Sequence, residues 1–125
     1  MKNTSLVGKH GEDIACEYLI SKRYKILARN WRKQWGEIDI VARAPDTTLV
    51  FCEVKALSHS DDFKPEDHLN KKKMANMKKI GEFYARENEK EINPETGWRI
   101  DLIAIDLTNG ERNVINNSLR HFENI

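Results

Sequence analysis

The sequence contains few cysteines and no long apolar run, and both absences narrow the class of protein. Two cysteines, Cys16 and Cys52, are too few for a disulfide scaffold, and neither lies in a metal-ligand pair. We therefore expect a reducing, cytoplasmic setting. The longest purely apolar runs, 49–52 and 102–105, contain four residues each, whereas a membrane-spanning helix needs about 20. The first eight residues also lack the apolar segment of a signal peptide, so we expect neither export nor a membrane partner.

A large excess of charge of one sign is also missing. Twenty-one basic and twenty acidic residues leave a net charge of +1, which excludes a histone-like polycation. The distribution is nevertheless uneven: six basic residues and no acidic one lie between Tyr18 and Gly36, and lysines gather again at 71–73 and 78–79. A phosphate-binding surface around an acidic centre shows such segregation. Solvated helix faces produce it equally often.

The composition, with 39% apolar and 33% charged residues in 125, is that of one globular domain, which we expect to span residues 1–125. Apolar periodicity and turn signals then predict the secondary structure. The predicted elements are a helix at 8–21, strands at 24–31, 37–43 and 49–56, a helix beginning at Pro65, and strands at 100–107 and 114–115. Short connections predict an antiparallel meander for the first three strands, and Asn109-Gly110 indicates a hairpin between the last two. The predicted order is α-β-β-β-α-β-β.

Charged side chains interrupt two of the apolar strands. Because successive side chains point to opposite faces, Glu53 and Lys55 share one face, about 7 Å apart along the strand. On the preceding strand, the same alternation predicts the even-numbered residues from 38 to 42 on one face and Asp39 on the other. The hairpin that joins the two strands can therefore bring Asp39 beside Glu53 and Lys55.

These three side chains offer the groups that metal-assisted phosphodiester hydrolysis needs. Asp39 and Glu53 supply hard oxygen ligands for Mg²⁺, which takes one or two carboxylates together with water and phosphate oxygens. Such a metal polarises the scissile phosphate and acidifies a water, while Lys55 can orient that water or stabilise charge on phosphorus. Glu12, on the first predicted helix, can turn inward and add a carboxylate, directly or through water.

An exposed ion pair between Glu53 and Lys55 is the alternative interpretation, because the pattern Glu-x-Lys often arises by chance. The surroundings favour the functional interpretation. Both charges follow the apolar run 49–52, and Asp39 interrupts the apolar segment 38–41. Charges in such strands are costly unless they are paired, at an edge or bound to metal.

Several motifs, in the same order and spacing, are similar to those of a known family. They are Gly11-Glu12-Asp13-Ile14-Ala15, Tyr18-Leu19, Asn30-Trp31-Arg32, Gly36-Glu37-Ile38-Asp39-Ile40-Val41, Val50-Phe51-Cys52-Glu53-Val54-Lys55, Pro65-Glu66-Asp67, Lys73 and Arg99-Ile100-Asp101-Leu102-Ile103. On these motifs the chain resembles the YraN-type family, uncharacterised bacterial proteins regarded as candidate endonucleases and similar to archaeal Holliday junction resolvases. The resemblance covers nearly the whole chain.

The resemblance implies a restriction-endonuclease-like fold of the PD-(D/E)xK type, an α/β fold in which helices flank a mixed sheet. It also implies that Glu12, Asp39, Glu53 and Lys55 occupy active-site positions and that the cofactor is Mg²⁺ or Mn²⁺. One position departs from the family, which commonly has an arginine two residues after the motif lysine, where this chain has Leu57. We therefore expect one phosphate contact to be missing while the metal site stays complete.

Basic residues are the candidates for nucleic-acid binding. We select Arg29, Arg32, Lys33, Lys72 and Lys73. Among the lysines at 71–73, Lys73 matches a family position, which favours phosphate contact there, although a solvated helix face explains the cluster equally well.

Two further groups have both a structural and a functional interpretation. Trp31, Trp35 and Tyr24 lie within the first basic segment, where they can serve as a stacking platform for unpaired bases, but packing at the core or rim is the default. Asp101 lies in an apolar strand on the same face as Arg99, and a structural ion pair is favoured there over catalysis.

Together these observations predict a metal-dependent endonuclease acting on DNA, branched or junction-like by the resemblance. A four-way junction needs two cuts, so a homodimer is expected by analogy. Two alternatives stay open: a non-cleaving nucleic-acid-binding module on the same fold, and an adaptor whose basic patches bind an acidic protein.

Overall fold

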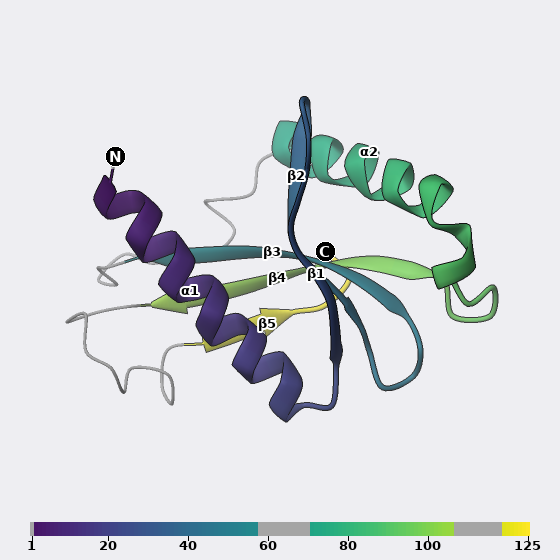
Figure 1. Cartoon of the computed structure of the whole chain (residues 1–125), viewed down its shortest axis with the longest axis horizontal. Helices are drawn as coiled ribbons and strands as arrows, with labels where there is room; N and C mark the ends of the chain where they lie inside the picture. Colours follow the sequence, from purple (N-terminus) through teal and green to yellow (C-terminus); the bar gives the residue numbers. More distant parts are fainter. Residues whose placement is uncertain (1, 58–70, 107–118) are drawn as a thin grey trace.

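Two helices cover opposite faces of a five-stranded sheet in the computed structural model of the chain (Figure 1). The structure describes residues 2–57, 71–106 and 119–125. The elements are α1 (Lys2–Ser21), β1 (Lys25–Lys33), β2 (Gly36–Arg43), β3 (Leu49–Leu57), α2 (Lys71–Glu87), the short 3₁₀ helix η2 (Glu89–Glu91), β4 (Trp98–Asp106) and β5 (Leu119–Phe122). The predicted α/β class and the order α-β-β-β-α-β-β are confirmed, and the arrangement agrees with a restriction-endonuclease-like fold.

The strands lie in the sheet in their sequence order, β1-β2-β3-β4-β5. Neighbouring strands β1 and β2 are antiparallel, as are β2 and β3, which confirms the predicted meander. Strands β3 and β4 are parallel, and β5 returns antiparallel to β4. A parallel pair needs a long crossover connection, and α2 lies in the connection between β3 and β4.

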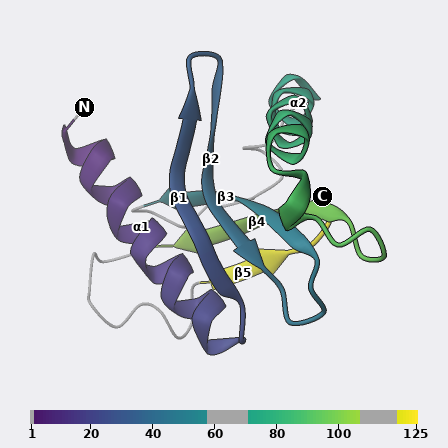
Figure 2. The ribbon, with the colours of Figure 1, turned by 45° about the vertical axis from the view of Figure 1, so that its right-hand side comes forward.

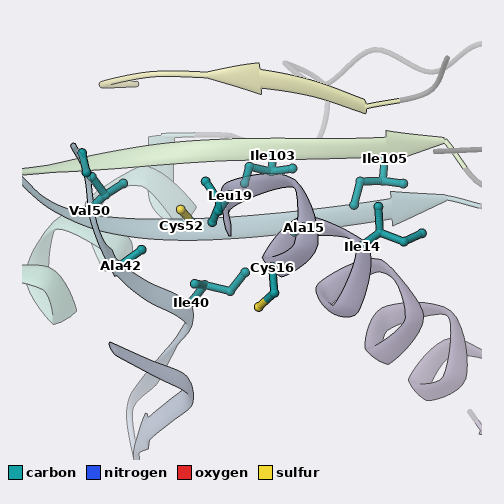
Figure 3. Close-up of a cluster of buried hydrophobic side chains, with 11 residues drawn as sticks. Ile14, Ala15, Cys16, Leu19, Ile40, Ala42, Val50, Cys52, Ile103 and Ile105 are labelled. Carbon is teal, nitrogen blue, oxygen red and sulfur yellow. The ribbon is translucent and has the colours of Figure 1, made fainter. Parts of the chain in front are cut away.

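Each helix buries an apolar face against one side of the sheet. Figure 3 shows the α1 side, where Ile14, Ala15 and Leu19 face apolar side chains of the strands. On the opposite side, Ile80 and Tyr84 of α2 pack in a second cluster formed with the sheet. The second cluster comprises Ile38, Val41, Leu49, Phe51, Ile80, Tyr84 and Ile100. Alternate residues of β3 thus face different helices, which confirms the predicted alternation along that strand.

The β1–β2 hairpin bends where Asn30 and Asp39 face each other, and its tip extends beyond the other strands (Figures 1 and 2). Arg29 pairs with Ile40 and Trp31 pairs with Ile38, but Asn30 and Asp39 between them do not form a regular strand pair. Asn30 has a positive φ of 53°. Strand β2 pairs with β3 only between Ile40 and Arg43. The bend corrects one prediction: Ile38 packs on the α2 side with Val41, whereas Ile40 and Ala42 pack on the α1 side. Simple alternation fails because β2 turns away from β3 at Asp39.

The ends of several elements differ from the prediction. Helix α1 begins at Lys2, and the last described strand is Leu119–Phe122, which the sequence pattern did not indicate. The predicted strand at 114–115, the Asn109-Gly110 turn and the helix start at Pro65 lie outside the described residues. In the part of the chain that the structure describes, neither helix combines the length and apolar character needed to cross a bilayer.

Gly11, the residue before Glu12, allows α1 to approach β3 closely. A Cβ atom at position 11 would lie 2.6 Å from the Cβ of Ala56. We expect Gly11→Ala to lower the free energy of unfolding by about 1–3 kcal/mol, since overpacking outweighs the gain of about 1 kcal/mol in helix propensity. Urea denaturation measures the change. Ala56→Gly should restore part of the loss in the double variant, and a single Gly11→Ala variant as stable as the wild type would contradict the expectation.

Candidate active site

Asp39 is a buried carboxylate at the point where β2 leaves β3. Its exposed fraction is 7%, and its Oδ2 accepts a hydrogen bond of 2.8 Å from the Val54 N–H. The carboxylate therefore takes the place of a backbone acceptor that the departing strand no longer offers to β3. Burial raises the pKa of Asp39 to about 7, and the negative charge of Glu53 adds to the rise against the hydrogen bond from Val54. Asp39 and Glu53 are thus close enough to repel each other.

Glu53 lies on β3 with two lysines around its carboxylate. Lys73 of α2 places Nζ 2.8 Å from Glu53 Oε2, and Lys55 places Nζ 3.8 Å from the same oxygen. Only 13% of the Glu53 side chain is exposed. Glu53 and Lys55 do form the pair that their spacing predicted, but the pair lies in a half-buried cluster with Asp39 rather than on a solvated face.

The pKa values of these two lysines are shifted in opposite directions. Burial lowers the pKa of Lys55, and the positive charge of Lys73 lowers it further, against the attraction of Glu53. For Lys73, burial alone would lower the pKa, but the hydrogen bonds to Glu53 and Lys55 and the negative charges of Glu53 and Asp39 together outweigh it and raise the pKa above its usual value. Lys73 is therefore held as a cation on Glu53, while Lys55 gives up its proton more easily than an ordinary lysine.

Glu12 belongs to the same electrostatic neighbourhood. Its negative charge contributes to the raised pKa of Asp39. Its side chain is 16% exposed, and Oε1 lies 3.8 Å from Arg29 Nη2. The structure thus couples Asp39 of β2 electrostatically to Glu12 of α1 and to Glu53 of β3, and Lys55 lies beside Glu53.

The same region has no preassembled cage for a metal. Within residues 2–57, 71–106 and 119–125, no three histidine, cysteine, aspartate or glutamate side chains are gathered so that they could hold an ion. Two carboxylates that repel each other nevertheless offer the donor chemistry of a hard cation, because Mg²⁺ takes its remaining ligands from water and substrate. Asp39 and Glu53 therefore fit a divalent ion of this class.

A cleft of about 390 Å³ opens beside Glu53, between the tip of the β1–β2 hairpin and α2. Its lining residues are Trp35, Gly36, Glu37, Glu53, Lys72, Lys73, Asn76, Met77 and Ile80. Of the four candidate residues, Glu53 lines this cleft. The cleft gives a ligand access to Glu53 from the α2 side.

The residues predicted to bind nucleic acid are distributed over two places. Lys72 and Lys73 line the cleft, whereas Lys33 places Nζ 5.4 Å from the ring centres of Trp31 and Phe83. Arg29 instead pairs with Asp13 at 2.8 Å. Arg32 pairs with Glu37 at 3.1 Å, with both side chains largely exposed. The sequence pattern had indicated Lys73 as a phosphate ligand, but it contained no signal for the ion pair with Glu53.

Asp101 has a structural environment on the α1 side of the sheet. It is fully buried and accepts hydrogen bonds from Arg99 Nε at 2.9 Å and from the Asn124 N–H at 2.9 Å. His121 Nε2 lies 2.7 Å from Asp101 Oδ2, and His121 Nδ1 lies 2.9 Å from the Tyr18 hydroxyl. The predicted ion pair with Arg99 is confirmed, whereas the contact with His121 had no sequence signal.

The unusual pKa of Asp39 should appear in the pH dependence of stability. An unfolded aspartate has a pKa near 3.9 and the folded one about 7, so the stability contributed by the protonated form is complete below pH 4 and is lost as pH rises through 7. Asparagine cannot ionise and imitates the protonated acid. We expect Asp39→Asn to exceed the wild type in unfolding free energy by on the order of 2 kcal/mol at pH 8, measured by urea denaturation with chelator.

Near pH 4 the same two proteins should unfold at nearly equal urea concentrations. A difference between them that stays constant from pH 4 to pH 8 would show that the Asp39 carboxyl titrates normally in the folded chain. Added Mg²⁺ provides a second check, because it should stabilise the wild type more than Asp39→Asn.

Comparison with other proteins places the chain among a group of bacterial relatives. Residues 11–105 match the model of a family described as uncharacterised protein family UPF0102. The chain is similar to a UPF0102 protein of Campylobacter concisus, with 40% identity over 106 residues that cover 85% of this chain and 88% of the relative. A UPF0102 protein of Flavobacterium johnsoniae is 39% identical over 105 residues, with 84% of each chain covered. Another from Persephonella marina is 34% identical over 120 residues, covering 94% and 90%.

Proposed function

The chain belongs to the uncharacterised protein family UPF0102, which is the YraN family that its motifs predicted, and we propose that it is a metal-dependent endonuclease. The reaction is hydrolysis of phosphodiester bonds in DNA that is branched or junction-like. The observation that carries the proposal is the buried carboxylate of Asp39, whose pKa is raised to about 7 by burial and by Glu53. A divalent cation between two such carboxylates would relieve their repulsion.

Asp39 and Glu53 would hold the metal, Mg²⁺ or Mn²⁺, with Glu12 acting through a bound water. When bound, the metal would polarise the scissile phosphate and acidify a water. The hydrogen bond from the Val54 N–H fixes the orientation of the Asp39 carboxylate, so its second oxygen is positioned in advance. Two carboxylates are sufficient protein ligands for Mg²⁺, since substrate oxygens and waters complete its coordination.

Lys55 would orient the attacking water or stabilise the charge that develops on phosphorus. Burial lowers the pKa of Lys55, and the neighbouring Lys73 lowers it further, so its ammonium is a better proton donor than an ordinary lysine. Lys73 would leave Glu53 and contact a phosphate oxygen as the strand enters the cleft. Lys72 lines the same cleft and adds a second positive charge for the DNA backbone.

A four-way junction requires two cuts on opposite strands, so a junction-cleaving form would act as a homodimer with one site in each chain. Single cuts in flaps or other branched DNA need one site only. The proposal therefore extends to both kinds of branched substrate.

One contact favours a second candidate function, a nucleic-acid-binding module that does not cut. The Lys73 ammonium lies 2.8 Å from Glu53 Oε2, where it neutralises the carboxylate that the metal would need. In such a module the ion pair would be permanent, and the basic residues around the cleft would bind DNA without hydrolysis.

A panel of labelled junctions, flaps, single strands and duplexes separates the two candidates. Incubation with Mg²⁺, with Mn²⁺ and with chelator should give cleavage of branched DNA only when metal is present. Asp39→Ala should lose cleavage while its salt-sensitive DNA binding survives. Binding without cleavage in any metal would support the module, and no binding at low salt would leave the protein-binding adaptor.

A further inference from the structure

An exposed indole forms one wall of the cleft that contains Glu53. Trp35 lies in the turn between β1 and β2, is 47% exposed, and lines the cleft together with Glu53. Among the described residues it is one of three large apolar side chains that stay exposed, with Ile20 and Phe122. The cleft therefore offers an aromatic surface and a candidate phosphate-hydrolysing site to the same ligand.

Packing against α2 holds this indole in place. Phe83 meets Trp35 edge to face, with ring centres 5.3 Å apart and planes at 87°. Gly36 follows directly, and a Cβ there would lie 2.9 Å from Ile80 Cδ1, so the hairpin tip is seated closely on the helix. A side chain placed in this way loses little freedom when it binds a flat ligand.

Positive charges surround the aromatic group. Lys79 Nζ lies 5.9 Å from the Trp35 ring centre, and Lys33 Nζ lies 5.4 Å from the ring centre of Phe83. Lys72 and Lys73 line the cleft together with Trp35. Aromatic rings for stacking combined with lysines for phosphates form the chemistry that binds single-stranded nucleic acid without sequence preference.

We propose that Trp35 stacks on the base of an unpaired nucleotide whose strand passes along the cleft towards Glu53. The inference rests on the proposed function and deepens it, because the substrate is then single-stranded beside the scissile phosphate. Bases inside a duplex already stack on each other and cannot offer a face to the indole. An unpaired nucleotide offers both a free base and a backbone phosphate.

The test measures binding in chelator, where no cleavage can occur. Fluorescence anisotropy gives Kd for a labelled single strand, a flap and a blunt duplex of related sequence. The wild type should bind the single strand and the flap more tightly than the duplex. Trp35→Ala should weaken binding of the first two by about 5- to 150-fold, the range expected for one base stacked on an aromatic ring, with little effect on the duplex.

Two variants serve as controls. Trp35→Phe keeps an aromatic face and should retain most of the affinity, while Phe122→Ala removes another exposed aromatic ring that does not line the cleft and should change nothing. Equal affinity of Trp35→Ala and the wild type for single strands would overturn the inference, as would an equal loss on the duplex. A protein that binds in this Trp35-dependent way but never cuts would support the stacking site and refute the nuclease. Cleavage that does not depend on Trp35 would support the nuclease and refute the stacking site.

Discussion

Replacing Glu53 with glutamine is expected to lower the rate of metal-dependent DNA cleavage at least about 100-fold, the scale on which loss of one charge-stabilising group affects catalysis. The substitution keeps the shape of the side chain but removes the charge that would hold the metal beside Asp39. It also removes the anchor of Lys73, whose Nζ lies 2.8 Å from Glu53 Oε2. Initial rates on a labelled flap in saturating Mg²⁺ measure the effect.

A matched control lies in the same cleft. Glu37 also lines it but is half exposed and paired with Arg32, so Glu37→Gln should cut within about twofold of the wild-type rate. If Glu53→Gln cleaved DNA at the wild-type rate, Glu53 would not be part of the active site. NMR titration supplies a readout that is independent of cleavage, because the pKa of Asp39 should fall below about 7 once the charge at position 53 is gone.

Asp101→Ala should cause the largest loss of stability, about 3–5 kcal/mol of unfolding free energy at pH 7. The substitution leaves the guanidinium of Arg99 and the ring of His121 without their buried acceptor. It also frees the Asn124 N–H, which holds the end of the chain against β4. Urea denaturation followed by circular dichroism measures the change.

Glu123→Ala is the control for this network, since Glu123 lies 3.8 Å from Arg99 but is mostly exposed, and its loss should be small. The effect at Asp101 should also depend on pH. Burial alone would raise the pKa of Asp101, but hydrogen bonds from His121 and Arg99 outweigh it and lower the pKa. The stability from Asp101 is thus present above the unfolded pKa of about 3.9 and lost as pH falls below it. If Asp101→Ala lowered the free energy of unfolding equally at pH 7 and pH 3, this account of the pKa of Asp101 would be contradicted.

The elements that the sequence predicted well are those in which local periodicity and burial agree. Strand β3 is the clearest example, because the alternation that put Glu53 and Lys55 on one face also separates Cys52 from Phe51. The helical spacing of Ile80 and Tyr84 likewise matches the face that α2 buries. In such elements each side chain's position follows from its own strand or helix.

Features that depend on two distant segments could not be predicted in this way. Ile38 lies on the opposite side from Ile40 because Asn30 and Asp39 bend the hairpin together, and neither residue alone indicates a bend. The ion pair between Lys73 and Glu53 depends on where α2 crosses the sheet. His121 reaches Asp101 only through the pairing of β5 with β4, and β5 itself had no clear strand pattern.

The irregularity of β1 has a consequence for how two copies of the chain could associate. Strand β1 is an edge strand of the sheet, and it is irregular. Its pairing register with β2 shifts between Ile26 and Ala28, and the backbone of Asn30 departs from extended geometry. Exposed lysines at both ends of β1 add charge to this edge. Edge strands that are irregular and charged resist pairing with a strand of another chain. A homodimer of this protein would therefore not form by extending the sheet of one copy across β1 into the sheet of the other.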